Sequence, residues 1–405
     1  MTDSVRLEMT GFPGSFSARD HLASYRTVDR ETVFAEASTD HVAIHVTEPG
    51  RKIAWSRNMR MDLCIGTDLD AFRDIHSRPA YNTSAYYLAA FRDAIVDVRT
   101  GFFLYDDRRA WSDSCFATIQ HGPVHFSPAV EPRGDERWFS LAKANPATLD
   151  VGTPVMLLTH WGSLTNYGHW LANTLVAAYQ VLPELQARRL ALVCPSLSDR
   201  QKRELLLIGV PNGQIIETTA QYVKIPHFVY ASAVSTIGNM APAPVCMEMM
   251  QVLKGTVTRT PDQVAPEYLY VSRLGAAHSR IMRNEDELVA ALAEIGVTTI
   301  RPHALSFDAQ VRAFSRARLV IGQLGAALWN LPFAPRGGAF VEISTRNYAS
   351  NEYVAISQLM GRCAVQIMVD RSAEDYRDDV AFAFDCPIAQ TVEIAQTLMA
   401  ELERS

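Results

Sequence analysis

Residues 268–300, YLYVSRLGAAHSRIMRNEDELVAALAEIGVTTI, decide the fold class of this sequence. They open with an apolar strand pattern at 268–272, continue with a helix that Asn284 should cap, and return to a strand at 297–300. Carboxylates in the first helical turn suit the positive end of the helix dipole, and Gly296 is a typical helix stop. A strand, a helix and another strand in this order predict a parallel sheet with crossover helices.

The same alternation extends in both directions along the chain. Apolar strands are expected at 155–158 and 190–193, with a helix from 166 to about 182 between them. The next helix should begin after Ser198 and end at Gly209. The remaining expected elements are strands at 214–217 and 227–230, a helix capped by Ser306, strands at 319–322 and 339–343, and an amphipathic helix that closes the chain.

The sequence therefore predicts an α/β protein with two Rossmann-like domains and an additional N-terminal β-rich segment. Residues 1–150 hold short strand-like stretches broken by turn residues, and four prolines between 236 and 266 indicate a boundary near residue 260. Two such domains in tandem place a ligand in the cleft between them, at the carboxyl ends of the strands. The predicted limits are 1–150 for the β-rich segment, 151–260 and 261–386 for the two domains, and 387–405 for a C-terminal helix.

The composition of the chain excludes several classes of protein. With 405 residues, 48% of them hydrophobic and a net charge of −6, the chain is neither disordered nor basic enough to coat nucleic acid. It lacks a run of 18 apolar residues, so we expect a cytoplasmic protein without stable membrane insertion. The scattered cysteines, without a CxxC pair, favour reduced core residues over zinc ligands or disulfides. They are Cys64, Cys115, Cys194, Cys246, Cys363 and Cys386.

The segment NYGHWLAN, residues 166–173, follows the strand at 155–158 after a short loop. In a regular α-helix Asn166, His169 and Asn173 would span about 60° of the circumference, opposite an apolar back. A neutral imidazole on such an edge could take a proton from an attacking hydroxyl. The alternative is a solvated helix face with a hydrogen-bonded histidine.

The segment SRLGAAHSRIMRNEDEL, residues 272–288, carries Arg273 at a strand end and Arg280 and Arg283 just before a helix. Guanidinium groups grip phosphate oxygens bidentately, and a helix N-terminus adds its own positive end. The alternative is that the carboxylates at 285–287 pair with these arginines on the surface.

Two further segments fit a nucleotide ligand more weakly. In IGQLGAALWNLPF, residues 321–333, a strand is followed by Gly325 and Ala326, whose small size lets backbone N–H groups approach a phosphate. In FVEI, Glu342 is expected at a strand end, where a carboxylate can bind ribose hydroxyls, or is simply exposed at an edge. The sequence holds no P-loop, nucleophile elbow or HExxH motif.

Taken in order, these segments resemble glycosyltransferase family 61. The matching elements are NYGHWLAN at 166–173, YVSR at 270–273, RxxRNE at 280–285, a helix at 305–317 that contains Gln310, GAALWN at 325–330, and FVEI. The resemblance covers roughly residues 150–345. It implies an inverting nucleotide-sugar transferase of the GT-B type, with the donor in the C-terminal domain and the acceptor in the N-terminal one. It implies no cofactor and no obligatory metal.

Carried over to this chain, the resemblance assigns residues to the two substrates. Arg273 and Arg280 would contact the diphosphate, and Glu342 would bind the ribose or base. His169 would be the catalytic residue on the acceptor side, flanked by Asn166 and Asn173. The rest of the donor set is Gln323, Gly325, Ala326 and Asn330.

The sequence departs from the family pattern at two positions. The family commonly has HGA where this chain has Gln323 and Leu324 before the GA pair, and it often has Asp where this chain has Asn173. An amide has no useful proton affinity, so either His169 takes the proton or the protein is a weakened or reassigned member.

The expected function is a hexosyl- or pentosyltransferase. It would move a sugar from a nucleotide donor, UDP-linked by our expectation, to a hydroxyl of a bacterial polysaccharide or other glycan. A catalytically silent homologue that binds nucleotide or glycan as a regulatory or assembly subunit is the alternative. An unrelated α/β hydrolase or reductase is a weaker third possibility, since the sequence lacks the motifs of both.

Overall fold

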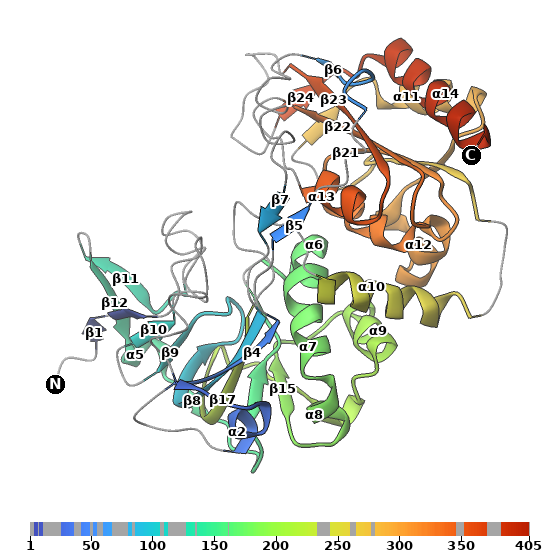
Figure 1. Cartoon of the computed structure of the whole chain (residues 1–405). Coiled ribbons are helices and arrows are strands. Elements are labelled where there is room, and N and C mark those ends of the chain that lie inside the picture. The colour runs from blue at the N-terminus through green and yellow to red at the C-terminus, as the bar shows by residue number, and fades with distance from the viewer. Residues whose placement is uncertain are drawn as a thin grey trace. The chain divides into compact units, whose positions relative to one another are not determined.

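The structure, a computed structural model, divides the chain into two compact units (Figure 1). Unit 1 comprises Met1–Arg51 and Asn82–Met249, and unit 2 comprises Lys52–Tyr81 and Met250–Ser405. The residues described are 4–6, 8–10, 26–35, 42–48, 52–54, 60–66, 80–82, 86–105, 109–111, 127–133, 136–160, 162–232, 244–259, 265–276, 280–345, 352–370 and 382–404.

Four parallel strands form the centre of unit 1, in the order β16-β15-β14-β17. Numbered along the chain, this is the order 3-2-1-4 of a Rossmann-like half. The strands predicted from apolar runs in this region are confirmed. They are β14 (Val155–Leu157), β15 (Ala191–Cys194), β16 (Ile215–Glu217) and β17 (Tyr222–Ala231).

Strands from the N-terminal region extend the same sheet. The long strand β8 (Tyr86–Asp97) pairs antiparallel with β17 along its length. The aromatic rings of Phe91, Phe103 and Phe228 pack together across these strands. The sheet also includes β2 (Glu8–Thr10), β3 (Arg26–Thr27), β4 (Ala43–Glu48), β9 (Phe103–Tyr105), β10 (Arg109–Trp111) and β13 (Ala147–Thr148). A separate sheet contains β1 (Ser4–Arg6), β11 (Val130–Arg133) and β12 (Glu136–Ser140).

The helices of unit 1 begin and end largely where local sequence chemistry predicts. Ser198 and Gln201 form a reciprocal capping box at the start of α9, and Gly209 ends that helix in the left-handed region at φ 99°. The helices are α2 (Arg30–Ala35), α5 (Leu141–Ala144), α6 (Tyr167–His169), the π-helix η2 (Trp170–Leu175), α7 (Val176–Gln180), α8 (Leu182–Gln186), α9 (Asp199–Ile208) and η3 (Asn212–Gln214). Helix α10 (Pro244–Val257) continues from unit 1 into unit 2.

Unit 2 contains a sheet of six parallel strands in the order β20-β18-β21-β22-β23-β6. Its first five strands follow the doubly wound order 2-1-3-4-5 along the chain. The parallel α/β arrangement predicted for this region is therefore confirmed. The strands are β6 (Ile65–Gly66), β18 (Tyr268–Val271), β20 (Thr298–Ile300), β21 (Leu319–Gln323), β22 (Ala339–Thr345) and β23 (Cys363–Val369).

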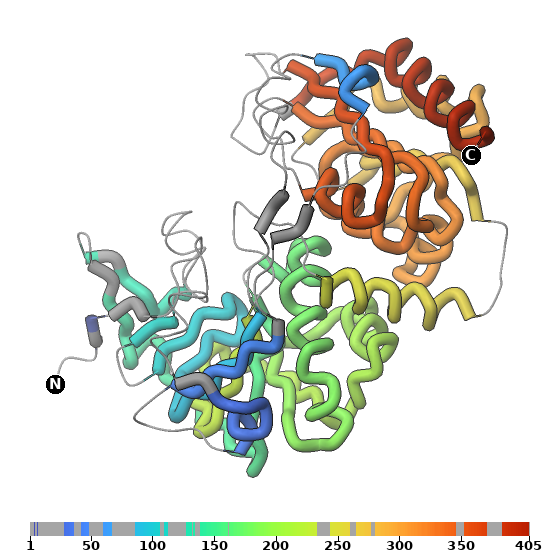
Figure 2. Tube along the Cα trace, in the orientation of Figure 1, coloured from blue at the N-terminus to red at the C-terminus, as the bar shows by residue number. Residues whose placement is uncertain are grey.

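The edge strand β6 comes from the first quarter of the chain. Figure 2 shows this blue segment beside the late strands in red. Arg60 ties it to the C-terminal helix through Glu401, at 2.6 Å. Gly66 is required because a Cβ there would lie 1.8 Å from the carbonyl oxygen of Met368. The sequence predicted no such excursion, since its partner strand lies about 300 residues downstream.

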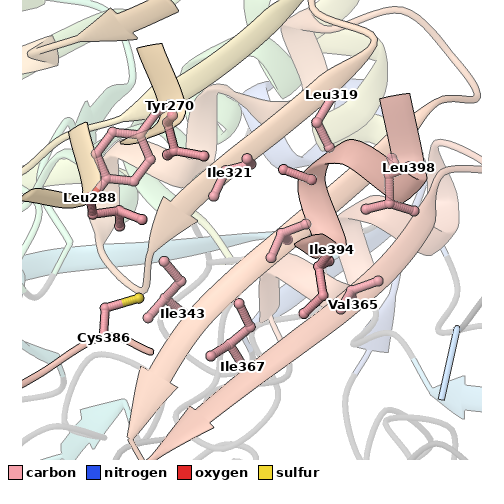
Figure 3. Close-up of a cluster of buried hydrophobic side chains, with 14 of the residues drawn as sticks. Tyr270, Leu288, Leu319, Ile321, Ile343, Val365, Ile367, Cys386, Ile394 and Leu398 are labelled. Carbon is pink, nitrogen blue, oxygen red and sulfur yellow. The ribbon is translucent and has the colours of Figure 1, made fainter. Parts of the chain in front are cut away.

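Apolar side chains from the strands and from three helices fill one face of this sheet (Figure 3). Leu288 of α11 and Leu398 of α14 pack there against Ile321, Ile343 and Val365. The other elements of unit 2 are a pair of short strands, β19 (Arg280–Met282) with β24 (Phe382–Phe384), a second pair, β5 (Lys52–Ala54) with β7 (Ala80–Asn82), and the helices α11 (Glu285–Glu294), η4 (Pro302–Ala304), α12 (Phe307–Phe314), η5 (Ala326–Phe333), α13 (Glu352–Leu359) and α14 (Ile388–Arg404).

Two helix predictions need correction. The helix expected at 166–182 is interrupted by the π-turns of η2, because a hydrogen-bonding pattern wider than that of an α-helix inserts there. Asn284 does stand at the N-cap of α11, but its side chain bonds the backbone of Cys386 instead. The cap predicted at Ser306 is confirmed by its bond from the Ala309 N–H.

The domain limits predicted from the sequence remain a prediction. The structure adds that β8 of the expected β-rich segment shares a sheet with β17, while β6 of that segment belongs to unit 2. All the described cysteines are free thiols, and Cys115 lies outside the described residues. Within the described ranges, no helix is long and apolar enough to cross a bilayer.

Candidate functional site

The large sheet of each unit has a point where the order of its parallel strands reverses. In doubly wound sheets ligands bind outside the carboxyl ends of the strands at this point, because the flanking loops diverge there. In unit 2 the point lies between β18 and β21, and in unit 1 it lies between β14 and β17. The segments that follow β18, β21 and β14 are therefore the places to examine for chemistry.

Arg273 and Gly325 meet at the switch point of unit 2. Arg273 follows β18 and Gly325 follows β21. A Cβ at position 325 would lie only 2.1 Å from Arg273 Nη1, so the guanidinium lies directly against the glycine backbone. Gly325 is also the N-cap of η5, whose first residue is Ala326. The structure thus brings together three residues predicted to bind the diphosphate.

Glu285 holds the backbone that carries Arg273. Its carboxylate is buried and accepts hydrogen bonds from the Arg273 N–H at 2.8 Å and from the Tyr270 hydroxyl at 3.0 Å. Burial and the nearby Glu285 carboxylate raise the pKa of Tyr270 well above its ordinary value. Arg283 pairs with Asp385 instead, at 2.5 Å. Glu285 thus holds the backbone of Arg273, while the alternative that the carboxylates at 285–287 pair with these arginines stays open.

Gln323 links the end of β21 to Arg280. Its side chain is buried, and Nε2 donates to the carbonyl oxygen of Arg280 at 3.3 Å. Its Oε1 has no hydrogen-bond partner among the residues that the structure describes. The link places Arg280 at the same end of the sheet as Gln323, and the predicted donor contacts of both residues stay predictions.

Glu342 does not lie at a strand end, as the sequence suggested, because β22 continues to Thr345. Its side chain is completely buried, and Oε1 accepts from Gln366 Nε2 of the neighbouring strand at 2.9 Å. Burial raises its pKa to about 8, although bonds from Gln366 and Ser344 act the other way. Glu342 is therefore not an exposed edge residue, and a role as ribose or base ligand stays a prediction.

Asn330 is packed inside unit 2. It is fully buried, and its Nδ2 donates to Gln310 Oε1 at 2.9 Å and to the Ala327 carbonyl at 3.0 Å. Gln310 Nε2 in turn donates to the Pro302 carbonyl at 2.9 Å. The pair joins η5 to α12, which gives Asn330 a structural role; its predicted contact with the donor stays a prediction.

At the switch point of unit 1, His160 is a buried histidine that sequence reasoning missed. Its Nδ1 lies 3.3 Å from Thr174 Oγ1, and its Nε2 lies 3.2 Å from the carbonyl oxygen of Ala231, the last residue of β17. Burial lowers its pKa to about 4, so the ring is neutral at physiological pH. The imidazole fastens β14 to β17 and η2. Its place just after an apolar strand was the available sequence clue.

His169 and Asn173 form a hydrogen-bonded pair at the start of the following helix. Asn173 Nδ2 lies 3.3 Å from His169 Nδ1, and Asn173 is buried in η2. Burial lowers the pKa of His169 to about 4. Asn166 stands apart from this pair, since it caps α6 by accepting bonds from Gly168 and His169 N–H groups. The structure therefore pairs His169 with Asn173 and gives Asn166 a helix-capping contact, and the acceptor-side role of all three residues stays a prediction.

A second network under this helix was also missed from the sequence. Glu204 of α9 is fully buried and accepts a short hydrogen bond from Trp170 Nε1. Arg200 lies 3.4 Å from Glu204 Oε1, and its guanidinium lies 4.6 Å from the centre of the Tyr167 ring. Burial raises the pKa of Glu204 to about 7 despite the lowering effect of Arg200 and Trp170. These contacts fix α6 and η2 against α9.

The chemistry available at the two switch points differs. Arginine forks and backbone amides in unit 2 suit a phosphate group, whereas unit 1 offers a neutral imidazole and amides. Among the described residues, no group of three or more His, Cys, Asp and Glu side chains could hold a metal ion. A shared cleft between His169 and Arg273 remains a prediction.

A family model described as Glycosyltransferase 61 matches residues 167–341. The matched range runs from the helix that carries His169 to the middle of β22, so it includes Arg273, Arg280 and Gly325. No curated protein matches the chain.

Two solved structures of TibC are similar to this chain. One is described as a bacterial iron-containing dodecameric glycosyltransferase from enterotoxigenic E. coli H10407; it is 14% identical, over 64% of this chain and 77% of its own, with a TM-score of 0.30. The other is the dodecameric iron-containing heptosyltransferase TibC in complex with ADP-D-beta-D-heptose, 13% identical over 78% of this chain and 94% of its own, also with a TM-score of 0.30. Both likenesses are weak.

Proposed function

We propose, from the premise that residues 167–341 form a glycosyltransferase family 61 domain, that this chain transfers a sugar from a nucleotide donor to a hydroxyl of a glycan. The finer parts of the proposal are a GT-B arrangement, inversion at the anomeric carbon, a UDP-linked hexose or pentose as donor, and a bacterial polysaccharide as acceptor. A cytoplasmic location belongs to the same proposal.

The single observation that carries the proposal is the contact of Arg273 with Gly325 at the switch point of unit 2. A guanidinium held against bare backbone, beside the start of η5, presents donors that match phosphate oxygens. Glu285 holds the Arg273 N–H, and Gln323 holds the Arg280 carbonyl, so both arginine backbones are fixed before a ligand arrives. A preformed site of this kind stabilises a leaving diphosphate without reorganisation.

The proposed reaction needs little covalent chemistry from the protein. The acceptor oxygen forms a bond to the anomeric carbon while the bond from that carbon to the diphosphate oxygen breaks. The diphosphate leaves with the electron pair, stabilised by Arg273 and Arg280, and the hydroxyl proton passes to a base or to water. His169 is proposed to contact the acceptor. Positioning and charge stabilisation would supply most of the rate.

A catalytically silent homologue remains the second candidate. Its supporting observation is the His169–Asn173 pair, in which an amide rather than a carboxylate touches the ring. In that case unit 2 would still bind nucleotide, and the chain would act as a regulatory or assembly subunit.

Two measurements on the full chain test the proposal. Titration calorimetry with UDP, and separately with ADP and GDP, should show binding that Arg273→Ala weakens about tenfold or more, because a charge-assisted phosphate contact is lost. A panel of nucleotide sugars should then show slow hydrolysis of at least one donor. Binding without any turnover favours the silent homologue. The absence of binding by all three nucleotides contradicts both candidates.

A further inference from the structure

The hydrogen bond between Asn173 and His169 fixes which ring nitrogen carries the proton. Asn173 Nδ2 is an amide nitrogen and can only donate, so His169 Nδ1, 3.3 Å away, must accept. The ring is neutral at physiological pH, because burial lowers its pKa to about 4. A neutral imidazole has one proton, and with Nδ1 as the acceptor that proton must be on Nε2.

The ring is held in this orientation from a second side. Gly162, in the loop that follows β14, lies so close that a Cβ there would be 3.2 Å from His169 Cδ2 and 3.8 Å from Nε2. The carbonyl of Gly162 accepts the Asn166 N–H at 2.9 Å, which ties this loop to the start of α6. Trp170, the next residue along the chain, is anchored on Glu204. The imidazole edge bearing Nε2 is thus on the side of Gly162, and the edge bearing Nδ1 is on the side of Asn173.

We infer that Asn173 fixes the Nε2–H tautomer of His169, so that this imidazole donates a hydrogen bond to an oxygen of the sugar acceptor and does not remove its proton. The second half of this inference rests on the proposed function. It replaces the role as base that the sequence suggested for His169. A base would need the opposite arrangement, in which an acceptor on Nδ1 leaves Nε2 unprotonated. Asn173 is a positioning residue in this account.

The test compares Asn173→Asp with a matched control. A carboxylate at position 173 offers only acceptors, so it should move the ring proton from Nε2 to Nδ1. Asn166→Asp makes the same chemical change three residues before His169, where the side chain contacts backbone N–H groups instead of the ring. It should leave the tautomer unchanged.

The tautomer is read from nitrogen NMR spectra of the full chain labelled with ¹⁵N-histidine. The chain has 11 histidines, and the resonances lost in His169→Gln identify His169. We expect a protonated Nε2 in the natural chain and in Asn166→Asp, and a protonated Nδ1 in Asn173→Asp. A protonated Nδ1 in the natural chain overturns the inference, because the amide of Asn173 would then present its oxygen to the ring.

The catalytic half is read from hydrolysis of the best donor in the nucleotide-sugar panel, in which a water oxygen takes the place of the acceptor hydroxyl beside His169. If His169 donates from Nε2, Asn173→Asp should lower the rate roughly two- to tenfold, the effect of one lost hydrogen bond. An unchanged or faster rate in a variant whose tautomer has switched shows that His169 is not a donor in the reaction. If no donor is hydrolysed by the natural chain, the proposed function fails and the donor role with it, while the NMR spectra still decide the tautomer.

Discussion

Among the residues that the structure describes, unit 1 and unit 2 each bury one glutamate completely, Glu204 and Glu342, but they surround these carboxyl groups differently. Glu204 has a cation beside it, since Arg200 lies 3.4 Å away. Glu342 contacts only neutral groups in the described part of the sheet, and Gln366 Nε2 is its donor. Burial raises the pKa of both, to about 7 for Glu204 and about 8 for Glu342.

The two units also differ in what their arginines contact. In unit 1, Arg200 lies beside the buried carboxylate of Glu204. The neighbouring segment 166–173 itself presents only neutral groups. In unit 2 the buried carboxyl group of Glu342 accepts a hydrogen bond from the Gln366 amide. Arg273 lies instead at the switch point, against Gly325. Arg273 at the proposed donor edge, with the buried Glu342 carboxyl paired to an amide instead of a cation, fits the proposal that this edge binds an anion.

Removal of the unit 2 arginines should give the largest effect. Arg273→Ala and Arg280→Ala should each lower kcat/KM for donor hydrolysis by about 10²–10³-fold, because charge on the leaving diphosphate loses a preorganised donor. Circular dichroism melts should show an unchanged fold. A fully active Arg280→Ala enzyme would remove Arg280 from the donor site.

The matched control is Arg283→Ala. Arg283 is only three residues from Arg280, but it forms an exposed pair with Asp385. Exposed pairs contribute little, so both stability and turnover should stay close to those of the natural chain. Equal losses in all three variants would point to a general effect of charge instead of a site.

The buried glutamates should give the next largest effect, which is a change in the free energy of unfolding with pH. A carboxyl group whose pKa is raised by folding keeps its proton in the folded chain and loses it in the unfolded one. Its contribution is therefore full below about pH 4.5 and is lost as pH rises to the folded pKa. For Glu342 the window ends near pH 8, and the loss is of the order of 5 kcal/mol.

Glu342→Gln should abolish this loss. The amide keeps the bond from Gln366 and carries no charge, so the free energy of unfolding above pH 8 should exceed that of the natural chain. Glu204→Gln should show a smaller gain with a window that ends near pH 7, because it also removes the partner of Arg200. Urea denaturation at pH 5 and pH 8.5 measures both. A steeper pH dependence for Glu204 than for Glu342 would contradict the comparison.

How far the sequence could predict these features depends on how local their causes are. The strands between Val155 and Ile343, apart from β19, and the caps at Ser198 and Ser306 follow from neighbouring residues, and the sequence predicts them. The pairing of β6 with β23 and the bond from Trp170 to Glu204 join distant residues, so no short pattern reveals them. Glu342 was misplaced because the predicted strand ends with its apolar run at Ile343, although Ser344 and Thr345 continue β22.

The candidate site shows the same division. The presence of Arg273, Gly325 and His169 at strand–helix junctions could be predicted, since the carboxyl ends of parallel strands share one edge. The contact of Arg273 with Gly325, the capping role of Asn166 and the π-turns around Asn173 could not, because they depend on backbone geometry that the residue types alone do not determine.

Gly325→Ala should give a smaller loss than the arginine variants. Its new Cβ would lie 2.1 Å from Arg273 Nη1, so the guanidinium must move away while its charge remains. We expect donor hydrolysis to fall about tenfold, since misplacement costs less than removal. Gly255→Ala is the control: nothing lies within 4 Å of that position in α10, and the better helix former should stabilise the chain by about 0.5–1 kcal/mol.

The smallest effect should come from the cap of α9, which tests the packing side of the comparison. Ser198→Ala removes the acceptor for the Gln201 N–H and half of the capping box, at a cost of about 1 kcal/mol in the free energy of unfolding. Because α9 carries Glu204 and Arg200, fraying of its first turn should lower stability without changing nucleotide affinity in unit 2. Urea denaturation and UDP calorimetry on the same preparation measure both. A loss of UDP affinity comparable to that of Arg273→Ala would show that the helix of unit 1 takes part in donor binding, and the division between a packing arginine and ligand-binding arginines would then fail.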